Sequence, residues 1–295
     1  MNYSNSQRAG VILYLTALIF GAYHVLKRIR AIRSIGFIKA GAIGGWIEKG
    51  SNLSHEGSCW VGESAKVYDN AKITGDARIF DEAKVYDYAC VCGRASVYGT
   101  SEVFEDCIIR GNTQVCGDSR VYGKALLMQD SIVFGKARIS GGSQVCGEAQ
   151  IFGEAQVQGS TFVGGRARVC DEAWALGNCE IFEDAKISGE AIVYEQAQIF
   201  GKAQVSDNSV VYSKAKIFGN AKVKDDAIIC ENAMVCGDVS VEGKVCIRGH
   251  SLIGGAKVLT GKNVIYNNRE VVVIGGKHCN KLFGFNKAKN VYNIV

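Results

Sequence analysis

The chain has 295 residues and a formal net charge of +5, with 36 glycines, 12 cysteines and no proline. Lysines and arginines are dispersed along it, and no basic stripe is long enough to indicate specific nucleic-acid binding. The absence of proline fits a fold in which nearly every backbone N–H enters a β-ladder.

The N-terminal segment contains an apolar run, residues 11–26, which is followed by Lys27, Arg28, Arg30 and Arg33. A membrane anchor with a positive cytoplasmic flank is one interpretation. The run is shorter than the roughly 20 residues that cross a bilayer, so we favour a β-hairpin that caps the following domain. No small-residue cleavage site follows, which argues against a secretory signal. Membrane contact through residues 11–33 stays an open alternative.

A six-residue repeat, small–x–aliphatic–y–turn–turn, occupies residues 59–271. It reads AKVYDN from Ala65 and AKIFGN from Ala215, and its aliphatic position recurs every sixth residue from Val61 to Val271. The repeat predicts one elongated domain between an N-terminal segment, residues 1–58, and a C-terminal cap, residues 272–295, that covers the last strand edge.

The spacing explains why such a repeat coils. Side chains alternate along a strand, so the small and aliphatic positions point to the same side. Nearly every turn pair begins with Gly, Asp or Glu, as at Gly75, Gly117 and Asp207, residues that tolerate the positive φ of a sharp corner. Three strand-and-corner units close a triangle, so that one coil consists of three hexads. The sequence therefore predicts an all-β fold, a single-stranded parallel β-helix in the form of a triangular prism of about 12 coils.

The segments HVLKRIRAI, IKAGAIGGWIE, NLSHEG and CWV, followed by the hexads, resemble the YdcK-like family of bacterial and phage proteins. That resemblance implies the left-handed β-helix of the hexapeptide-repeat, trimeric acyltransferase-like superfamily, with acetyl-CoA as the implied cofactor and a homotrimer as the favoured assembly. One feature departs from the superfamily enzymes: Gly stands two positions after the aliphatic residue here, and one position after it there.

Catalytic candidates are few. Acyl transfer needs a general base with a pKa near the working pH, and the chain has four histidines, His24, His55, His250 and His278. His55 in NLSHEG and His250 at a corner are the weak candidates, each more simply explained as a cap or turn residue. The unbroken repeat also leaves no room for a substrate-shaping loop. We expect no cofactor unless acetyl-CoA binds.

The cysteines indicate neither disulfides nor a metal site. Cys59, Cys107 and Cys179 take the small position, as small hydrophobic residues in a reducing compartment would. Cys90 and Cys92 form a lone CxC whose neighbours one coil away offer no further ligand. We expect no metal.

One outward face is apolar over four consecutive coils. Stepping by one coil, or three hexads, brings its side chains into two columns. This set, called the apolar strip below, comprises Trp174, Leu176, Ile192, Tyr194, Val210, Tyr212, Ile228 and Cys230, with Cys246 beside the last coil. Soluble proteins rarely leave such a surface bare, so we expect it to contact another subunit, the end segments or a partner protein.

Two functions follow as hypotheses. The first is a non-enzymatic, cytoplasmic scaffold, a rigid β-helix that self-associates or binds a partner through the apolar strip. The second is an acyl- or acetyltransferase that works at a subunit interface with His55 or His250 as its base. Acetyl-CoA binding distinguishes them.

Overall fold

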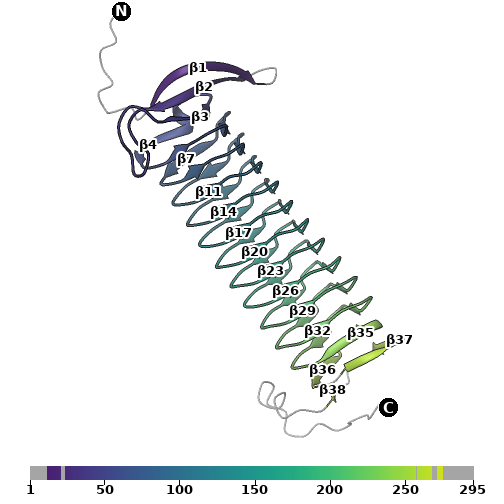
Figure 1. Ribbon diagram of the computed structural model, residues 1–295. Helices are drawn as coiled ribbons and strands as arrows, with labels where there is room; N and C mark the ends of the chain where they lie inside the picture. Colours follow the sequence, from purple (N-terminus) through teal and green to yellow (C-terminus); the bar gives the residue numbers. More distant parts are fainter. Residues whose placement is uncertain (1–11, 21–23, 257, 268–270, 275–295) are drawn as a thin grey trace, which may run out of the picture. The chain divides into compact units, whose positions relative to one another are not determined.

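A computed structural model of the chain describes residues 12–20, 24–256, 258–267 and 271–274. These residues form β-strands, corners and one short 3-10 helix. They divide into two compact units, residues 1–141 and 142–295, and each unit is a stack of short parallel strands (Figure 1). The prediction of an all-β parallel solenoid of about 12 coils is confirmed. Its left-handed sense stays a prediction.

In the first unit, the elements begin with a hairpin and continue as regular coils. They are β1 (Ile12–Phe20), β2 (His24–Ala31), β3 (Ile43–Ile47), the 3-10 helix η1 (Gly50–Asn52), β4 (Leu53–Gly57), β5 (Trp60–Val61), β6 (Lys66–Val67), β7 (Lys72–Gly75), β8 (Arg78–Ile79), β9 (Lys84–Val85), β10 (Cys90–Val91), β11 (Ser96–Val97), β12 (Glu102–Val103), β13 (Ile108–Ile109), β14 (Gln114–Val115), β15 (Arg120–Val121), β16 (Leu126–Leu127), β17 (Ile132–Val133) and β18 (Arg138–Ile139).

In the second unit, regular coils lead into longer strands. They are β19 (Gln144–Val145), β20 (Gln150–Ile151), β21 (Gln156–Val157), β22 (Phe162–Val163), β23 (Arg168–Val169), β24 (Trp174–Ala175), β25 (Glu180–Ile181), β26 (Lys186–Ile187), β27 (Ile192–Val193), β28 (Gln198–Ile199), β29 (Gln204–Val205), β30 (Val210–Val211), β31 (Lys216–Ile217), β32 (Lys222–Val223), β33 (Ile228–Ile229), β34 (Met234–Val235), β35 (Ser240–Arg248), β36 (Leu252–Gly255), β37 (Val258–Asn267) and β38 (Val271–Ile274).

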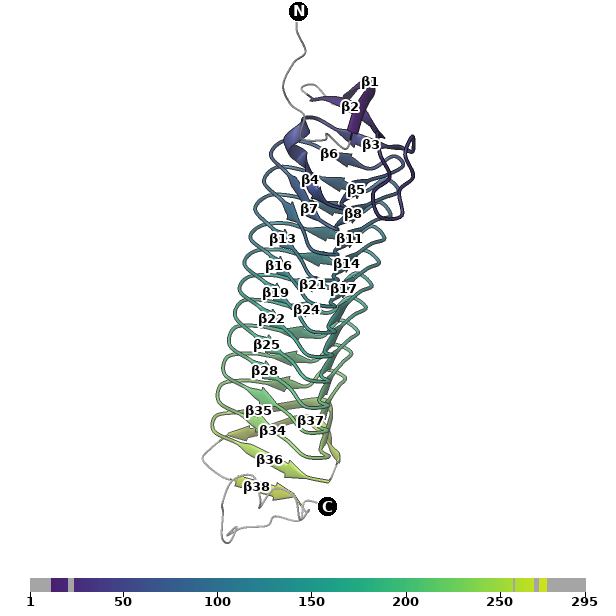
Figure 2. The ribbon, with the colours of Figure 1, turned by 90° about the vertical axis from the view of Figure 1, so that its left-hand side faces the viewer.

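Strand register follows the repeat. Each regular strand pairs in parallel with the strand three places later, so that Lys66 lies opposite Lys84 and Val67 opposite Val85. Because each coil contributes three strands, each unit carries three columns of strands. In the first unit one column contains β13 and β16, and in the second unit one column contains β19, β22, β25 and β28 (Figure 2).

The core of each stack consists of the aliphatic and small positions. Val67 and Ala65 are both fully buried, and a buried Val or Ile contributes about 1.5–3 kcal/mol to folding. At five of the small positions that carry Ser or Thr, the hydroxyl donates to the carbonyl three residues earlier; these residues are Ser101, Thr113, Thr161, Ser209 and Ser251. Ser101 Oγ, for example, donates to the Tyr98 carbonyl at 2.8 Å. At these five positions the bond satisfies a hydroxyl that is buried in the stack, whereas the buried Ser119 hydroxyl has no partner among the described residues.

The corners have the predicted left-handed backbone. Gly75 has φ +68° and Asp207 has φ +57°. Acidic corner residues also join neighbouring coils, because their carboxylates accept the N–H of the corresponding corner residue one coil later. Asp81 Oδ2 accepts the Gly99 N–H at 2.8 Å, and Asp225 Oδ2 accepts the Gly243 N–H at 2.7 Å. The carboxylate thus offsets part of the strain that a non-glycine residue meets there.

The N-terminal cap is built from β1, β2 and β3. β1 pairs with β2 and β2 with β3, both antiparallel, and β3 then pairs in parallel with β6. The two glycines of GGWIE allow β3 to lie close to the first coil. A Cβ at Gly44 would lie 2.6 Å from the Trp60 ring, and a Cβ at Gly45 would lie 2.6 Å from the Ala65 carbonyl oxygen. Among the described residues, no helix is long and apolar enough to cross a membrane.

Asn52 closes the first coil. Its side chain is fully buried, its Oδ1 accepts the Lys49 N–H at 2.8 Å, and its Nδ2 donates to the carbonyls of Asp69 at 3.1 Å and Ala71 at 2.9 Å. The NLSHEG segment therefore begins with a residue that replaces the missing preceding coil. This satisfies main-chain groups that would otherwise lack partners.

The repeat frame slips by one residue near its C-terminal end. Val241 pairs with Leu259, three hexads later, but the partners of Val245 and Ile253 are Val264 and Val272, each one position beyond three hexads. The prediction that the aliphatic position continues unbroken to Val271 is therefore wrong for the last hexads. Residues 275–295 of the expected C-terminal cap, and His278 among them, lie outside the described residues.

Candidate functional site

The apolar strip lies on one column of strands in the second unit. Trp174 of β24 is in register with Ile192 of β27, Ile192 with Val210 of β30, Val210 with Ile228 of β33, and Ile228 with Cys246 of β35. The pairing follows directly from the step of three hexads per coil. The structure therefore brings together the outward side chains that the sequence placed on one face.

Exposure varies along the strip. Trp174 is 41% exposed and Ile228 is 37% exposed, while Ile192 and Val210 are half-buried. In the second column the rings of Tyr194 and Tyr212 stack with centroids 4.9 Å apart. Cys230 departs from the expectation, because only 3% of it is exposed and it offers almost no contact surface. The surface of the strip is thus made by Trp174, the aliphatic side chains and the two tyrosines.

Three titratable groups of the strip, Tyr194, Tyr212 and Cys246, are neutral at physiological pH. A hydrogen bond with Cys230, with burial, raises the pKa of Tyr212 to about 12. Burial raises the pKa of Tyr194 and also that of the Cys246 thiol. Burying these groups against another surface would therefore not require desolvation of a charge, which is the dominant cost of burying polar surface.

Polar residues border the strip. The corners that directly follow Tyr194, Tyr212 and Cys230 form a shallow hollow of about 350 Å³. Its lining consists of Glu195, Gln196, Ser213, Lys214, Glu231 and Asn232. An apolar centre beside a charged and amide-rich border is the arrangement that protein–protein interfaces have.

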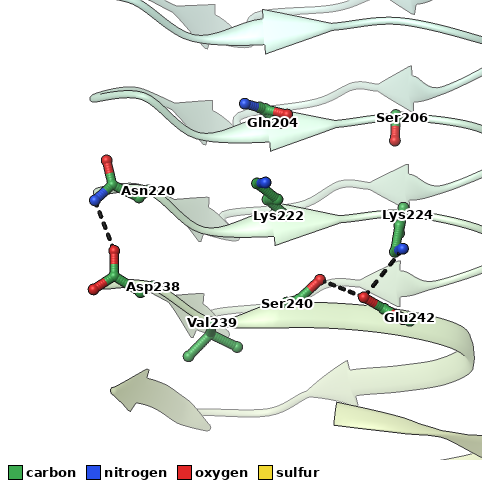
Figure 3. A pocket seen from close by; sticks show the side chains of 9 residues that line it. All are labelled: Gln204, Ser206, Asn220, Lys222, Lys224, Asp238, Val239, Ser240 and Glu242. Carbon is green, nitrogen blue, oxygen red and sulfur yellow. Dashed lines mark hydrogen bonds and ion pairs between the residues drawn. The ribbon is translucent and has the colours of Figure 1, made fainter. Parts of the chain in front are cut away.

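A different face of the second unit is polar. A hollow of about 580 Å³ lies over β29, β32 and the start of β35 (Figure 3). It is lined by Gln204, Ser206, Asn220, Lys222, Lys224, Asp238, Val239, Ser240 and Glu242. Lys224 Nζ lies 3.1 Å from Glu242 Oε1, and Ser240 Oγ donates to the same oxygen at 2.8 Å. These hydrogen bonds, from Ser240 first, lower the pKa of Glu242. The face carries charges that pair with one another, in contrast to the apolar strip.

Aromatic columns stabilise the strands in both units. Successive rings have centroids 4.9–5.0 Å apart and planes within 3° of parallel. The columns are Tyr68–Tyr86–Phe104–Tyr122 and Phe182–Phe200–Phe218. Because the ring faces contact one another, inner rings have no face to offer a sugar, and the stacking supports the strand pairing instead.

The catalytic candidates lie apart in the chain and on the surface. His55 is an exposed residue of β4 in the first unit, and His250 is an exposed corner residue after β35 in the second. The neighbours expected for the CxC are found as well: Cys90 pairs with Lys72 on one side and Ile108 on the other. Burial raises the pKa of Cys90, which disfavours its metal-binding thiolate.

Sequence reasoning missed one group of residues. His24 at the start of β2, Glu48 after β3 and Asp69 after β6 converge at the N-terminal cap, with potential ligand atoms within 4.8 Å of one another. The signal was present in the HVLKRIRAI and GGWIE segments, which carry His24 and Glu48. Their convergence depends on how the cap folds onto the coil, and no repeat spacing encodes that.

No protein-family model matches the sequence, and a search of the curated proteins finds no significant relative.

Proposed function

We propose that the protein is a non-enzymatic scaffold, a rigid β-solenoid that self-associates through the apolar strip. The observation that supports this most directly is the uncharged surface on successive coils, in which Trp174 and Ile228 are exposed and Ile192 and Val210 half-buried. Four coils at about 4.8 Å give a strip roughly 15–20 Å long. Apolar patches of this kind on proteins usually mark an interaction site.

A homotrimer is the assembly we favour. The resemblance to the YdcK-like family and its hexapeptide-repeat superfamily supports three-fold assembly, and the regular strand column provides a straight, flat surface for it. Each subunit would offer the same strip, so the oligomer would close without leaving an unpaired copy.

The test replaces Ile192, Val210 and Ile228 together by Lys. Three charges on the strip should reduce the mass measured by light scattering to the 31.7 kDa of a single chain. A matched control replaces Gln144, Gln150 and Gln204, outward residues of other strand columns, by Lys. That control should keep the oligomeric mass. An unchanged mass in the Ile192/Val210/Ile228 variant, or an equal loss in the control, would contradict the proposal.

The acyltransferase hypothesis is the competing proposal, and it rests on the resemblance to the superfamily. Its candidate bases, His55 and His250, are exposed, whereas a tuned general base usually has a shielded environment. Calorimetric titration of the oligomer with acetyl-CoA separates the two proposals. Saturable binding that His250→Ala or His55→Ala abolishes would favour the enzyme over the scaffold.

A further inference from the structure

The N-terminal cap contains a histidine and two carboxylates that do not belong to the repeating pattern. His24 Nδ1 lies 3.1 Å from Glu48 Oε1 and 3.8 Å from Asp69 Oδ1. The three side chains are 25%, 25% and 31% exposed, respectively. They are therefore held at the surface of the cap but remain open to a small solute on one side.

We propose that His24, Glu48 and Asp69 form a binding site for a divalent transition-metal ion such as Zn²⁺. One imidazole nitrogen and two carboxylate oxygens are ligands that such ions accept. Zinc bonds of about 2.0–2.2 Å place neighbouring tetrahedral ligands roughly 3.3 Å apart. The distances of 3.1 and 3.8 Å from His24 Nδ1 bracket that value, so small side-chain rotations would complete the set.

Both carboxylates are positioned by the main chain. Glu48 Oε2 accepts the Asp69 N–H at 2.7 Å, and Asp69 Oδ2 accepts the Asp87 N–H at 3.4 Å. Each carboxylate thus turns its second oxygen toward His24. Hydrogen bonds that fix the orientation of ligands in this way are a regular feature of metal sites.

The imidazole is positioned by packing. The ring of His24 lies against that of Tyr68, with centroids 4.9 Å apart, and Tyr68 is itself 7% exposed within the aromatic column. The same contact directs Nδ1 toward the two carboxylates. Three side chains from β2, the end of β3 and the corner after β6 would supply the protein ligands, and water would take the open position.

The arrangement differs from the ordinary corners. Asp81, like Asp69, accepts the N–H of the corresponding corner residue one coil later, in this case the Gly99 N–H at 2.8 Å. Asp81 lies at a regular corner that His24 does not reach. At the cap, by contrast, the potential ligand atoms of one imidazole and two carboxylates lie within 4.8 Å of one another. A bound ion would link these side chains and would pin the β1–β2 hairpin to the first coil.

The experiment is a calorimetric titration of the full-length protein with ZnCl₂ at neutral pH. We expect one ion per chain at this site, with binding weakened by roughly tenfold or more in Glu48→Gln and in His24→Gln. The Gln variants keep a similar shape, and their folding is checked by circular dichroism. Asp81→Asn, which removes a corner carboxylate outside the site, should bind Zn²⁺ as the unmodified protein does.

Co²⁺ provides a second readout that excludes the cysteines. A site of one nitrogen and two oxygens gives weak visible bands without the intense near-ultraviolet thiolate-to-cobalt absorption. Equal Zn²⁺ affinity in Glu48→Gln and the unmodified protein, or a thiolate absorption with Co²⁺, would overturn the proposal. It is independent of the proposed scaffold function.

Discussion

Replacement of Asn52 by Ala should lower the stability of the N-terminal coil more than the loss of a single polar side chain usually does. Asn52 is fully buried and makes three hydrogen bonds to main-chain groups, at 2.8, 2.9 and 3.1 Å. Its removal leaves the Lys49 N–H and the carbonyls of Asp69 and Ala71 without these partners. A buried polar group left unsatisfied costs about 1–3 kcal/mol.

The Lys49 and Asp69 bonds are only part-buried, so water can replace them in part, whereas the Ala71 bond is buried. The expected loss is therefore about 2–4 kcal/mol, less than three full penalties. Asn52→Asp is the sharper variant, since it keeps the shape but replaces the donor toward the two carbonyls by an acceptor. It should cost at least as much as Asn52→Ala.

Hydrogen exchange of the amides around η1 and β4, combined with urea unfolding, measures both the local and the global effect. Asn70 serves as the matched control. It is exposed, and its Oδ1 accepts the Lys49 Nζ–H at 2.8 Å. Asn70→Asp should therefore change stability by less than about 0.5 kcal/mol. If Asn52→Asp were as harmless as Asn70→Asp, the role assigned to Asn52 in closing the first coil would be refuted.

Two further predictions concern the interior of the stacks. Ile199 is fully buried between Ile181 and Ile217. In urea unfolding, Ile199→Ala should therefore lower the free energy of unfolding by about 2–5 kcal/mol and Ile199→Val by about 0.5–1.5 kcal/mol. Equal losses in the two variants would contradict close packing around this side chain. Burial also raises the pKa of the Cys107 thiol to about 12, so mass spectrometry after alkylation at pH 8 should find half-exposed Cys90 modified well before Cys107. Because the native state holds that proton more tightly than the unfolded chain, this contribution to stability is complete below the unfolded thiol pKa of about 8.5 and is lost as the pH rises toward 12. Equal labelling of the two thiols would contradict the assigned burial.

The regular part of the fold could be predicted because one short rule is repeated. In each six-residue unit the short strand and its two-residue corner decide which side chains face the core. This rule correctly places Ile199 inside and Trp174 outside. The same step of three hexads per coil predicted the register of the apolar strip. It could not predict that Cys230 is covered, because this depends on the packing of its neighbours in space.

The slip near the C-terminal end could not be predicted for a different reason. Val264, Ile265 and Tyr266 are consecutive apolar residues, so the hydrophobic pattern there fits two registers equally well. The structure pairs Ile265 with Cys246 and Tyr266 with Ile247, a shift of one residue. The His24 cluster was missed because it joins a non-repeating cap to a repeating coil.

The two-residue corners also bear on how long the protein lasts in a cell. A protease must draw several consecutive residues, extended and unpaired, into its active site. Between Trp60 and Val239 the described strands are joined only by short corners. Many corner N–H groups donate to a carbonyl of the next coil; the Asn70 N–H, for example, donates to the Asp87 carbonyl at 2.7 Å. Residues 32–42, between β2 and β3, form the longest described connection, and limited digestion should cut there well before it cuts the coils.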